Sequence, residues 1–238
     1  MSLNRTGIEW TGRSWNPITG CFGPGGCKNF PKWCPYCYAR RMATRFAGTP
    51  AFPSGFEPTF HPDRLIEPYR LKKPSRIFTC SMGDMFGSWV PENWGGEILA
   101  AIANNPIHTF QVLTKCPENL LKWQKFFSPN LWLGVSVTRQ EDVKRIFYLR
   151  MVEPGIRFVS FEPLLGPIDI DLYGIHWIII GAQTCPTRIP EEEWVQTLID
   201  LAGKRGIPIF LKNNLRWPEK IQQFPKTRRE ELSHASNR

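Results

Sequence analysis

Short runs of consecutive apolar residues recur along the chain, and most are followed by a stretch with helical spacing. The runs read RIFTCS (76–81), HTFQVLT (108–114), LWLGVSV (131–137), RFVSFEP (157–163), HWIIIGAQ (176–183) and IPIFLK (207–212). Uninterrupted apolar runs of this length predict strands buried on both faces, as in a parallel sheet. We expect a seventh strand around residues 9–18.

Segments of helical periodicity lie between these runs. They are predicted over 91–104, 117–127, 139–149 and 190–206, with a further short, basic helix over 38–47. Residues 48–75 are rich in proline and glycine and are expected to form a long ordered loop. The regular alternation of strands and helices places the chain in the α/β class.

Seven parallel strands fit a doubly wound sheet or a small or partly open parallel (β/α) barrel of the TIM-barrel type. We favour the barrel because polar residues follow nearly every strand, and active sites of parallel barrels lie at the C-terminal ends of the strands. These residues include Ser81–Asp84, Thr114–Lys115, Ser136–Thr138, Glu162, Gln183–Thr184 and Lys212–Asn214. One barrel domain is expected over 1–217, followed by a charged tail over 218–238.

The charge of the chain favours a polyanionic partner. Lys and Arg outnumber Asp and Glu by 30 to 21, the net charge is +9, and the isoelectric point is about 9.4. DNA or RNA, bound through its phosphates, is one interpretation of this charge, and a basic surface that binds no partner is the other. No segment is long and apolar enough for a membrane span, and the first residues lack the apolar core of a signal peptide, so we expect a cytoplasmic protein.

Four of the seven cysteines fall between Cys21 and Cys37. In a reducing compartment such a cluster predicts a metal site rather than a disulfide framework. Cys34 and Cys37 form a C-x-x-C pair that leads into the basic helix, whose N-terminus favours the thiolate form. Thiolates bind both iron–sulfur clusters and zinc, and the spacing alone leaves both open.

Several motifs resemble the radical S-adenosylmethionine superfamily, and more closely a radical-SAM-like family of unknown function from bacteria, archaea and phages. They are GIEWTGRSWNPITGC, CPYCYARR, PTFHPDRL, EPYRLKKPSRIFTCSMGDMFG, HTFQVLTK, LWLGVSVT and RFVSFEPLLGPID, and the similarity runs from about Gly7 to Lys212. The superfamily pattern is C-x3-C-x-aromatic-C. Cys34, Tyr36 and Cys37 match its second half, and Cys21 matches its first cysteine. Here twelve residues, including Cys27, stand in place of the usual three.

This resemblance implies a [4Fe–4S] cluster held by Cys21, Cys34 and Cys37; a ligand set that uses Cys27 is the alternative. It also implies S-adenosylmethionine as cosubstrate and an external electron donor. The roles carried over are adenine binding by Tyr36, contact with the methionine moiety by Asp84 with Ser81 and Gly83, and ribose binding by Ser136. Glu162 and Lys115 are the candidate catalytic residues at the same mouth, either paired with each other or facing the substrate.

Two functions of different class follow from these observations. The first is a radical enzyme that modifies a nucleic acid or a nucleotide-like substrate. The second is a non-catalytic nucleic-acid-binding module whose cysteine loop is stapled by zinc or an iron–sulfur cluster. An iron with an open coordination position and the acidic turn at Asp84 would distinguish the enzyme from the module.

Overall fold

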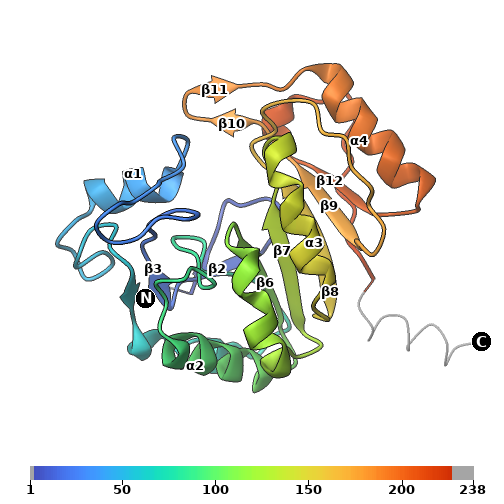
Figure 1. The fold of residues 1–238 in the computed structure, drawn as a ribbon. Helices are drawn as coiled ribbons and strands as arrows, with labels where there is room; N and C mark the ends of the chain where they lie inside the picture. The colour runs from blue at the N-terminus through green and yellow to red at the C-terminus, as the bar shows by residue number, and fades with distance from the viewer. Residues whose placement is uncertain (1–2, 227–238) are drawn as a thin grey trace, which may run out of the picture.

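An eight-stranded sheet forms the centre of the protein in the computed structural model, which describes residues 3–226 (Figure 1). Its strand order is β1-β2-β5-β6-β7-β8-β9-β12, and only the pairing of β1 with β2 is antiparallel. The strands are β1 (Asn4–Arg5), β2 (Arg13–Trp15), β5 (Arg76–Thr79), β6 (Thr109–Thr114), β7 (Leu131–Ser136), β8 (Ile156–Phe161), β9 (Trp177–Ile180) and β12 (Ile209–Leu211). The seven parallel strands and the α/β class are thus confirmed.

Helices and two small sheets surround this central sheet. The helices are α1 (Tyr38–Arg45), α2 (Glu92–Ala103), α3 (Lys144–Arg150) and α4 (Glu192–Lys204), with 3₁₀ helices η1 (Pro62–Arg64), η2 (Pro68–Arg70), η3 (Pro117–Phe126), η4 (Gln140–Asp142) and η5 (Asn213–Leu215). The small sheets pair β3 (Ile18–Thr19) with β4 (Thr59–Phe60), and β10 (Gln183–Thr184) with β11 (Thr187–Arg188). No helix among residues 3–226 is long and apolar enough to cross a bilayer.

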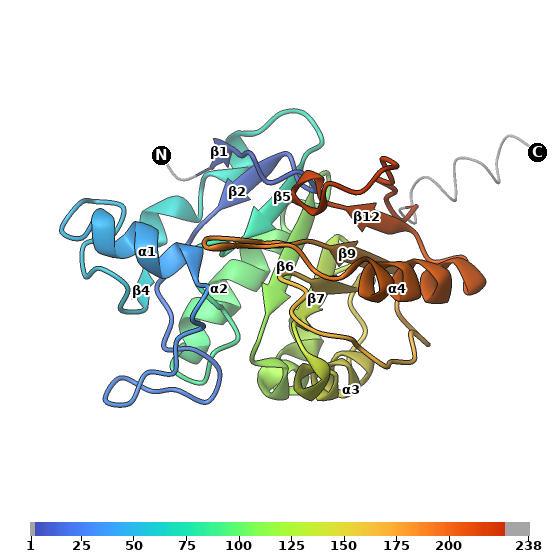
Figure 2. The same ribbon diagram turned by 90° about the horizontal axis from the view of Figure 1, so that it is seen from above.

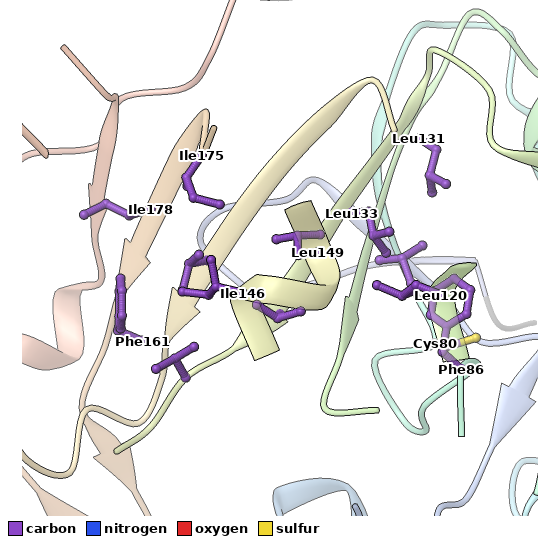
Figure 3. Packing of buried hydrophobic residues seen from close by; sticks show 14 of the residues in the cluster. Cys80, Phe86, Leu120, Leu131, Leu133, Ile146, Leu149, Phe161, Ile175 and Ile178 are labelled. Atoms are coloured by element: carbon purple, nitrogen blue, oxygen red, sulfur yellow. The ribbon is translucent and has the colours of Figure 1, made fainter. Parts of the chain in front are cut away.

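One hydrophobic cluster joins the helices to the sheet. Ile146 and Leu149 of α3 belong to the same buried cluster as Leu131 and Leu133 of β7 (Figure 3). The cluster takes alternate residues of each strand, because successive side chains of a strand point to opposite faces. The other set of alternate residues is therefore left for the inner face of the sheet.

The inner face carries a second, mostly aromatic cluster. It consists of Trp10, Phe78, Trp132, Phe158, Trp177, Ile179 and Phe210. The ring of Trp10 lies 4.6 Å from that of Phe78 on β5 and 6.3 Å from that of Trp177 on β9. Since strands far apart in the sheet contact one cluster, the sheet curves around it as in a barrel.

The barrel is only partly closed by backbone pairing. Among the described residues β9 is the only strand of the sheet that pairs with β12, whose other edge carries the segment around Gln222, so no strand ladder joins β12 to β1 or β2. Side chains and a C-terminal segment span this gap: the backbone N–H of Asn213 donates to Glu9 Oε2 (2.8 Å), and the guanidinium of Arg76 lies 3.7 Å from the centre of the Phe224 ring. The structure thus corresponds to the partly open form of the predicted barrel.

Three predicted segments differ in detail. Residues 117–126 form a 3₁₀ helix, because their buried residues Pro117, Leu120 and Trp123 are spaced by three rather than by three and four. The helix expected over 139–149 is divided into η4 and α3. Within the predicted charged tail, residues 221–224 run beside β12, and residues 227–238 lie outside the described residues.

Candidate active site

A cavity of about 440 Å³ opens at the C-terminal ends of the parallel strands. Every strand from β5 to β8 contributes residues from its end or from the loop that follows, and the segments after β9 and β12 complete the wall. The sequence-predicted site residues in the wall are Cys21, Cys34, Tyr36, Cys37, Ser81, Gly83, Asp84, Lys115, Ser136 and Glu162. The structure therefore brings together all of these residues, and it leaves Cys27 out of the wall.

The insertion between Cys21 and Cys34 folds back on itself and returns the chain to its starting point. The backbone N–H of Lys32 donates to the carbonyl of Phe22 (2.7 Å), and the indole N–H of Trp33 donates to the carbonyl of Cys21 (2.7 Å). Gly23 adopts a positive φ of 81°, and a Cβ there would lie 1.9 Å from the Lys32 carbonyl oxygen. Only glycine allows this close approach. The insertion therefore loops out without separating its ends.

Two of the predicted ligand thiols in the cavity wall accept hydrogen bonds from backbone N–H groups. Cys21 Sγ accepts a hydrogen bond from the Gly23 N–H (3.1 Å), and Cys37 Sγ accepts one from the Arg40 N–H (3.3 Å) at the start of α1. Burial raises the pKa of both thiols, and the Asp84 carboxylate raises that of Cys21 further. Burial thus disfavours the free thiolate forms of Cys21 and Cys37, and a positively charged metal group would offset that effect.

The spacing of these side chains bears on the kind of group they would hold. No three His, Cys, Asp or Glu side chains within residues 3–226 converge as ligands of a single metal ion. The cavity wall nevertheless brings together Cys21, Cys34 and Cys37, and thiol ligands of this kind suit soft metals, zinc and iron–sulfur clusters alike.

Asp84 lies buried in the turn that follows β5. Its carboxylate accepts hydrogen bonds from Thr114 Oγ1 (2.8 Å), the Lys115 backbone N–H (2.8 Å) and the Phe86 backbone N–H (3.1 Å). Burial raises its pKa, and these hydrogen bonds act in the opposite direction. The carboxylate thus ties the turn to the end of β6. A carboxylate has about four acceptor positions, so one remains for a ligand in the cavity.

Ser81 and Gly83 hold the same turn against the cysteine segment. Ser81 Oγ donates to the Asn16 side-chain oxygen (3.1 Å), and the Ser81 carbonyl accepts a hydrogen bond from the hydroxyl of Tyr38 (2.5 Å) on α1. Gly83 forms a β-bridge with Gly20, where a Cβ on Gly83 would lie 2.8 Å from the Gly20 carbonyl oxygen. The turn and the cysteine loop are therefore built as one unit.

The part of the cavity wall beside β6 and β7 is formed by Lys115, Ser136 and Tyr36. Lys115 Nζ donates to Ser136 Oγ (3.0 Å), and the Tyr36 hydroxyl donates to Thr138 Oγ1 (3.4 Å). Thr138 is fixed by Asp142, whose carboxylate accepts from the Thr138 hydroxyl (2.7 Å). Burial raises the pKa of Tyr36, so its hydroxyl remains a donor.

Glu162 pairs with a partner that sequence reasoning did not identify. Its carboxylate forms an ion pair with Lys212, which follows β12, whereas Lys115 is bonded to Ser136. The two partners are fifty residues apart in the chain. Curvature of the sheet, rather than sequence spacing, brings them together.

Two buried polar atoms in the cavity wall residues have no partner within the described chain. They are the indole N–H of Trp10 and the hydroxyl of Ser160. Ser160 stands directly opposite Ser136 on the neighbouring strand and follows Phe158 on the inner face. The alternation in RFVSFE was the signal that could have identified Ser160; Trp10 stands in a loop and gave none.

Other residues considered from sequence have mainly structural surroundings. His61 is buried and bonded to Thr19, and Trp15 is fully buried, with its N–H bonded to the Arg64 carbonyl. Cys80 is buried at the edge of the cavity, whereas Cys185 is exposed at the tip of the β10–β11 hairpin. That hairpin reaches across the strand ends toward α1, where Arg41 donates to the Cys185 carbonyl (2.7 Å; Figure 2).

A family model matches residues 5–235, nearly the entire chain, and its description is a protein of unknown function, DUF5131. The chain belongs to the DUF5131 family. No relative is found among curated proteins.

Solved structures of spore photoproduct lyase share the fold. One mutant has a TM-score of 0.53 at 11% identity over 85% of this chain and 64% of its own. A complex with dinucleoside spore photoproduct has a TM-score of 0.52 at 11% identity and covers the same shares of the two chains. A mutant with bound AdoMet and dinucleoside spore photoproduct has a TM-score of 0.50 at 11% identity, over 99% of this chain and 74% of its own. The match to a further mutant of this lyase covers only 54% of the lyase chain. At this identity the similarity establishes the fold.

Proposed function

We propose that this protein binds a [4Fe–4S] cluster through Cys21, Cys34 and Cys37 and uses S-adenosylmethionine for radical chemistry. One observation carries the proposal: an insertion that folds back on itself brings these three thiols to one cavity at the C-terminal ends of a parallel sheet. Thiolates are the usual ligands of such clusters. The fold shared with spore photoproduct lyase, which has been solved with bound AdoMet, supports it.

A bound cluster would supply one electron, received from an external donor, for cleavage of the sulfur–carbon bond of S-adenosylmethionine into methionine and a 5′-deoxyadenosyl radical. The chain's own residues would position the cosubstrate. Asp84, with Ser81 and Gly83, would bind the methionine moiety through the acceptor position that Asp84 leaves unused. Tyr36 and Ser136 would contact the adenosine on the opposite wall. Hydrogen bonds from Lys115 to Asp84 and Ser136, and from Tyr36 to Thr138, hold these groups in place before a ligand arrives.

Glu162 and Lys115 would face the substrate. Glu162 forms an ion pair with Lys212, and Lys115 donates a hydrogen bond to Ser136. Glu162 and Lys115 would thus be positioned to bind polar groups of the substrate or to move a proton. The aromatic cluster below them closes the lower end of the barrel and keeps water from the reacting atoms. The substrate would be a nucleic acid, as the net charge of +9 favours.

Anaerobic reconstitution with iron and sulfide tests the cluster. We expect the wild-type protein to turn brown, and the Cys21→Ala, Cys34→Ala and Cys37→Ala variants to lose most of their bound iron. Cys27→Ala is the matched control, because Cys27 is exposed and outside the cavity wall. Iron loss in Cys27→Ala together with retention in Cys21→Ala would refute this ligand set.

Formation of 5′-deoxyadenosine, measured by mass spectrometry after chemical reduction, tests the enzymatic function. Wild-type and Cys27→Ala proteins should both form it from S-adenosylmethionine. Stoichiometric zinc binding by a protein that takes up no iron would instead support the second candidate, a stapled nucleic-acid-binding module.

A further inference from the structure

A second hollow, of about 780 Å³, lies beside the cysteine loop. Helix α1 and the insertion form it, and Trp33 and Phe56 line both this hollow and the cavity. The two spaces are therefore neighbours along one surface. We call the second hollow the α1 groove.

The α1 groove is strongly basic. Lys28, Arg40, Arg41 and Arg45 line it, against a single carboxylate, Glu57. Glu57 lies 3.9 Å from Lys28, with both side chains exposed, and within residues 3–226 none of the three arginines forms an ion pair. A concave surface with excess positive charge attracts an anion more strongly than scattered surface charges do.

Each of the three guanidinium groups has an uncharged neighbour, which restrains it without neutralising it. The Arg40 guanidinium stacks over Trp33 at 4.9 Å from the ring centre, and that of Arg45 stacks over Phe46 at 5.4 Å. Arg41 donates to a backbone carbonyl of the β10–β11 hairpin. Such arginines keep their charge and their remaining N–H donors for phosphate oxygens.

The size of the cavity limits what can enter it. Its volume of about 440 Å³ lies toward the lower end of pockets for one small ligand, roughly 300–1,000 Å³. If S-adenosylmethionine occupies part of it, a substrate can insert only its reacting group and must leave the rest outside. The α1 groove is the adjoining hollow that could hold the rest.

We infer that the α1 groove binds the phosphate backbone of a single-stranded nucleic acid, so that one nucleotide can reach the cavity. The inference rests on the proposed function for what happens in the cavity, but binding in the groove is independent of it. A single strand is favoured because a base must leave the stack of a duplex to enter an enclosed site. The exposed indole of Trp33 offers a base the stacking surface that single-strand sites use.

Fluorescence anisotropy with a labelled single-stranded oligonucleotide of about 12 nucleotides, a length within the usual site sizes, tests the inference. The variant Lys28→Gln/Arg45→Gln removes two positive charges from the groove and touches no proposed cluster ligand. We expect the slope of log affinity against log salt to become shallower by about 1.4, since each contact with a single strand contributes about 0.7.

The matched control is Lys72→Gln/Lys73→Gln. These exposed lysines precede β5 and therefore lie toward the end of the sheet opposite the cavity. Their loss removes the same charge and should leave the slope unchanged. An equal loss in both variants would show that only net charge matters and would overturn the groove assignment.

Three further outcomes are decisive. If Lys28→Gln/Arg45→Gln no longer binds the oligonucleotide but keeps a normal iron content, the groove assignment is supported, even if the wild-type protein cleaves no S-adenosylmethionine. Equal affinity for duplex and single strand overturns the single-strand assignment. Absence of oligonucleotide binding at low salt, or displacement by an acidic peptide at equal concentration, overturns the nucleic-acid assignment while leaving the cluster proposal intact.

Discussion

Along the inner face of β8, Phe158 is followed by Ser160 and then, just beyond the strand, by Glu162. The first belongs to the aromatic cluster and the other two to the cavity wall. Because alternate residues of a strand share a face, each step of two along the chain moves from the closed lower end of the barrel toward its polar mouth. This alternation explains why polar residues at strand ends predicted the wall of the cavity. It does not specify their partners, such as Lys212 for Glu162.

His61 provides a prediction at the scale of one side chain. It is buried and bonded to Thr19 (2.9 Å), and burial together with Arg64 lowers its pKa to about 4, against an ordinary value of 6.5. The folded protein therefore favours neutral His61, whereas the unfolded chain takes up a proton below pH 6.5. The free energy of unfolding has its full contribution from His61 above pH 6.5 and loses it as the pH falls toward 4. The free energy of unfolding should decrease by about 1.5 kcal/mol between pH 6.5 and 5 on this account.

Urea denaturation of His61→Gln at the two pH values isolates this effect. Glutamine keeps a polar partner for Thr19 but does not titrate. Burial also lowers the pKa values of His108 and His176, but both residues remain in wild type and variant, so their contributions cancel in the comparison. If the variant loses as much stability on acidification as the wild type, the protonation of His61 is not coupled to unfolding.

Among the elements, α1 combines structural and chemical roles in its first residues. Cys37 precedes the helix in an extended conformation, and its sulfur accepts the Arg40 N–H in the manner of an N-cap. The sequence indicated both the helix and the C-x-x-C pair. It could not indicate the return path of the insertion, which depends on backbone contacts between Phe22 and Lys32.

Replacing Cys37 by serine or alanine separates these roles. A serine hydroxyl caps a helix well but is not a soft metal ligand, whereas alanine does neither. We expect both variants to lose iron, and metal-free Cys37→Ser to be about 1 kcal/mol more stable than Cys37→Ala in urea denaturation. Equal stabilities would exclude a capping role, and full iron content in either variant would exclude Cys37 as a required ligand.

Elements with ambiguous spacing were the least predictable. The segment 117–126 has an apolar face that fits either kind of helix, and only the burial of every third residue distinguishes them. The β10–β11 hairpin lacks apolar alternation because its strands are two residues long and mostly exposed. Such short pairings depend on their surroundings, here on the Arg41 contact, rather than on local propensity.

At the scale of the whole molecule, the order of the strands followed from their sequence because consecutive parallel strands joined by helices lie side by side. The way the barrel closes did not. Closure depends on contacts such as Asn213 with Glu9, 204 residues apart, and on residues 221–224, which are too polar to suggest a core segment. The basic C-terminal residues are correspondingly divided. Lys212 lies in the cavity wall, Lys226 follows a segment bonded to the start of β12, and Arg228 and Arg229 lie outside the described residues.

The segment 221–224 gives the last prediction. Its backbone pairs with β12 through the Leu211 N–H to the Ile221 carbonyl (2.7 Å), and the Phe224 ring lies 5.4 Å from those of Trp177 and Phe210. Phe224→Ala should lower the free energy of unfolding by about 2 kcal/mol, because it removes a partly buried ring that fills the gap between the sheet edges. Phe147→Ala is the control, since Phe147 is 64% exposed and should change stability by less than about 0.5 kcal/mol. Urea denaturation of the metal-free proteins measures both; similar small losses in the two variants would mean that the segment covers the barrel without helping to hold it closed.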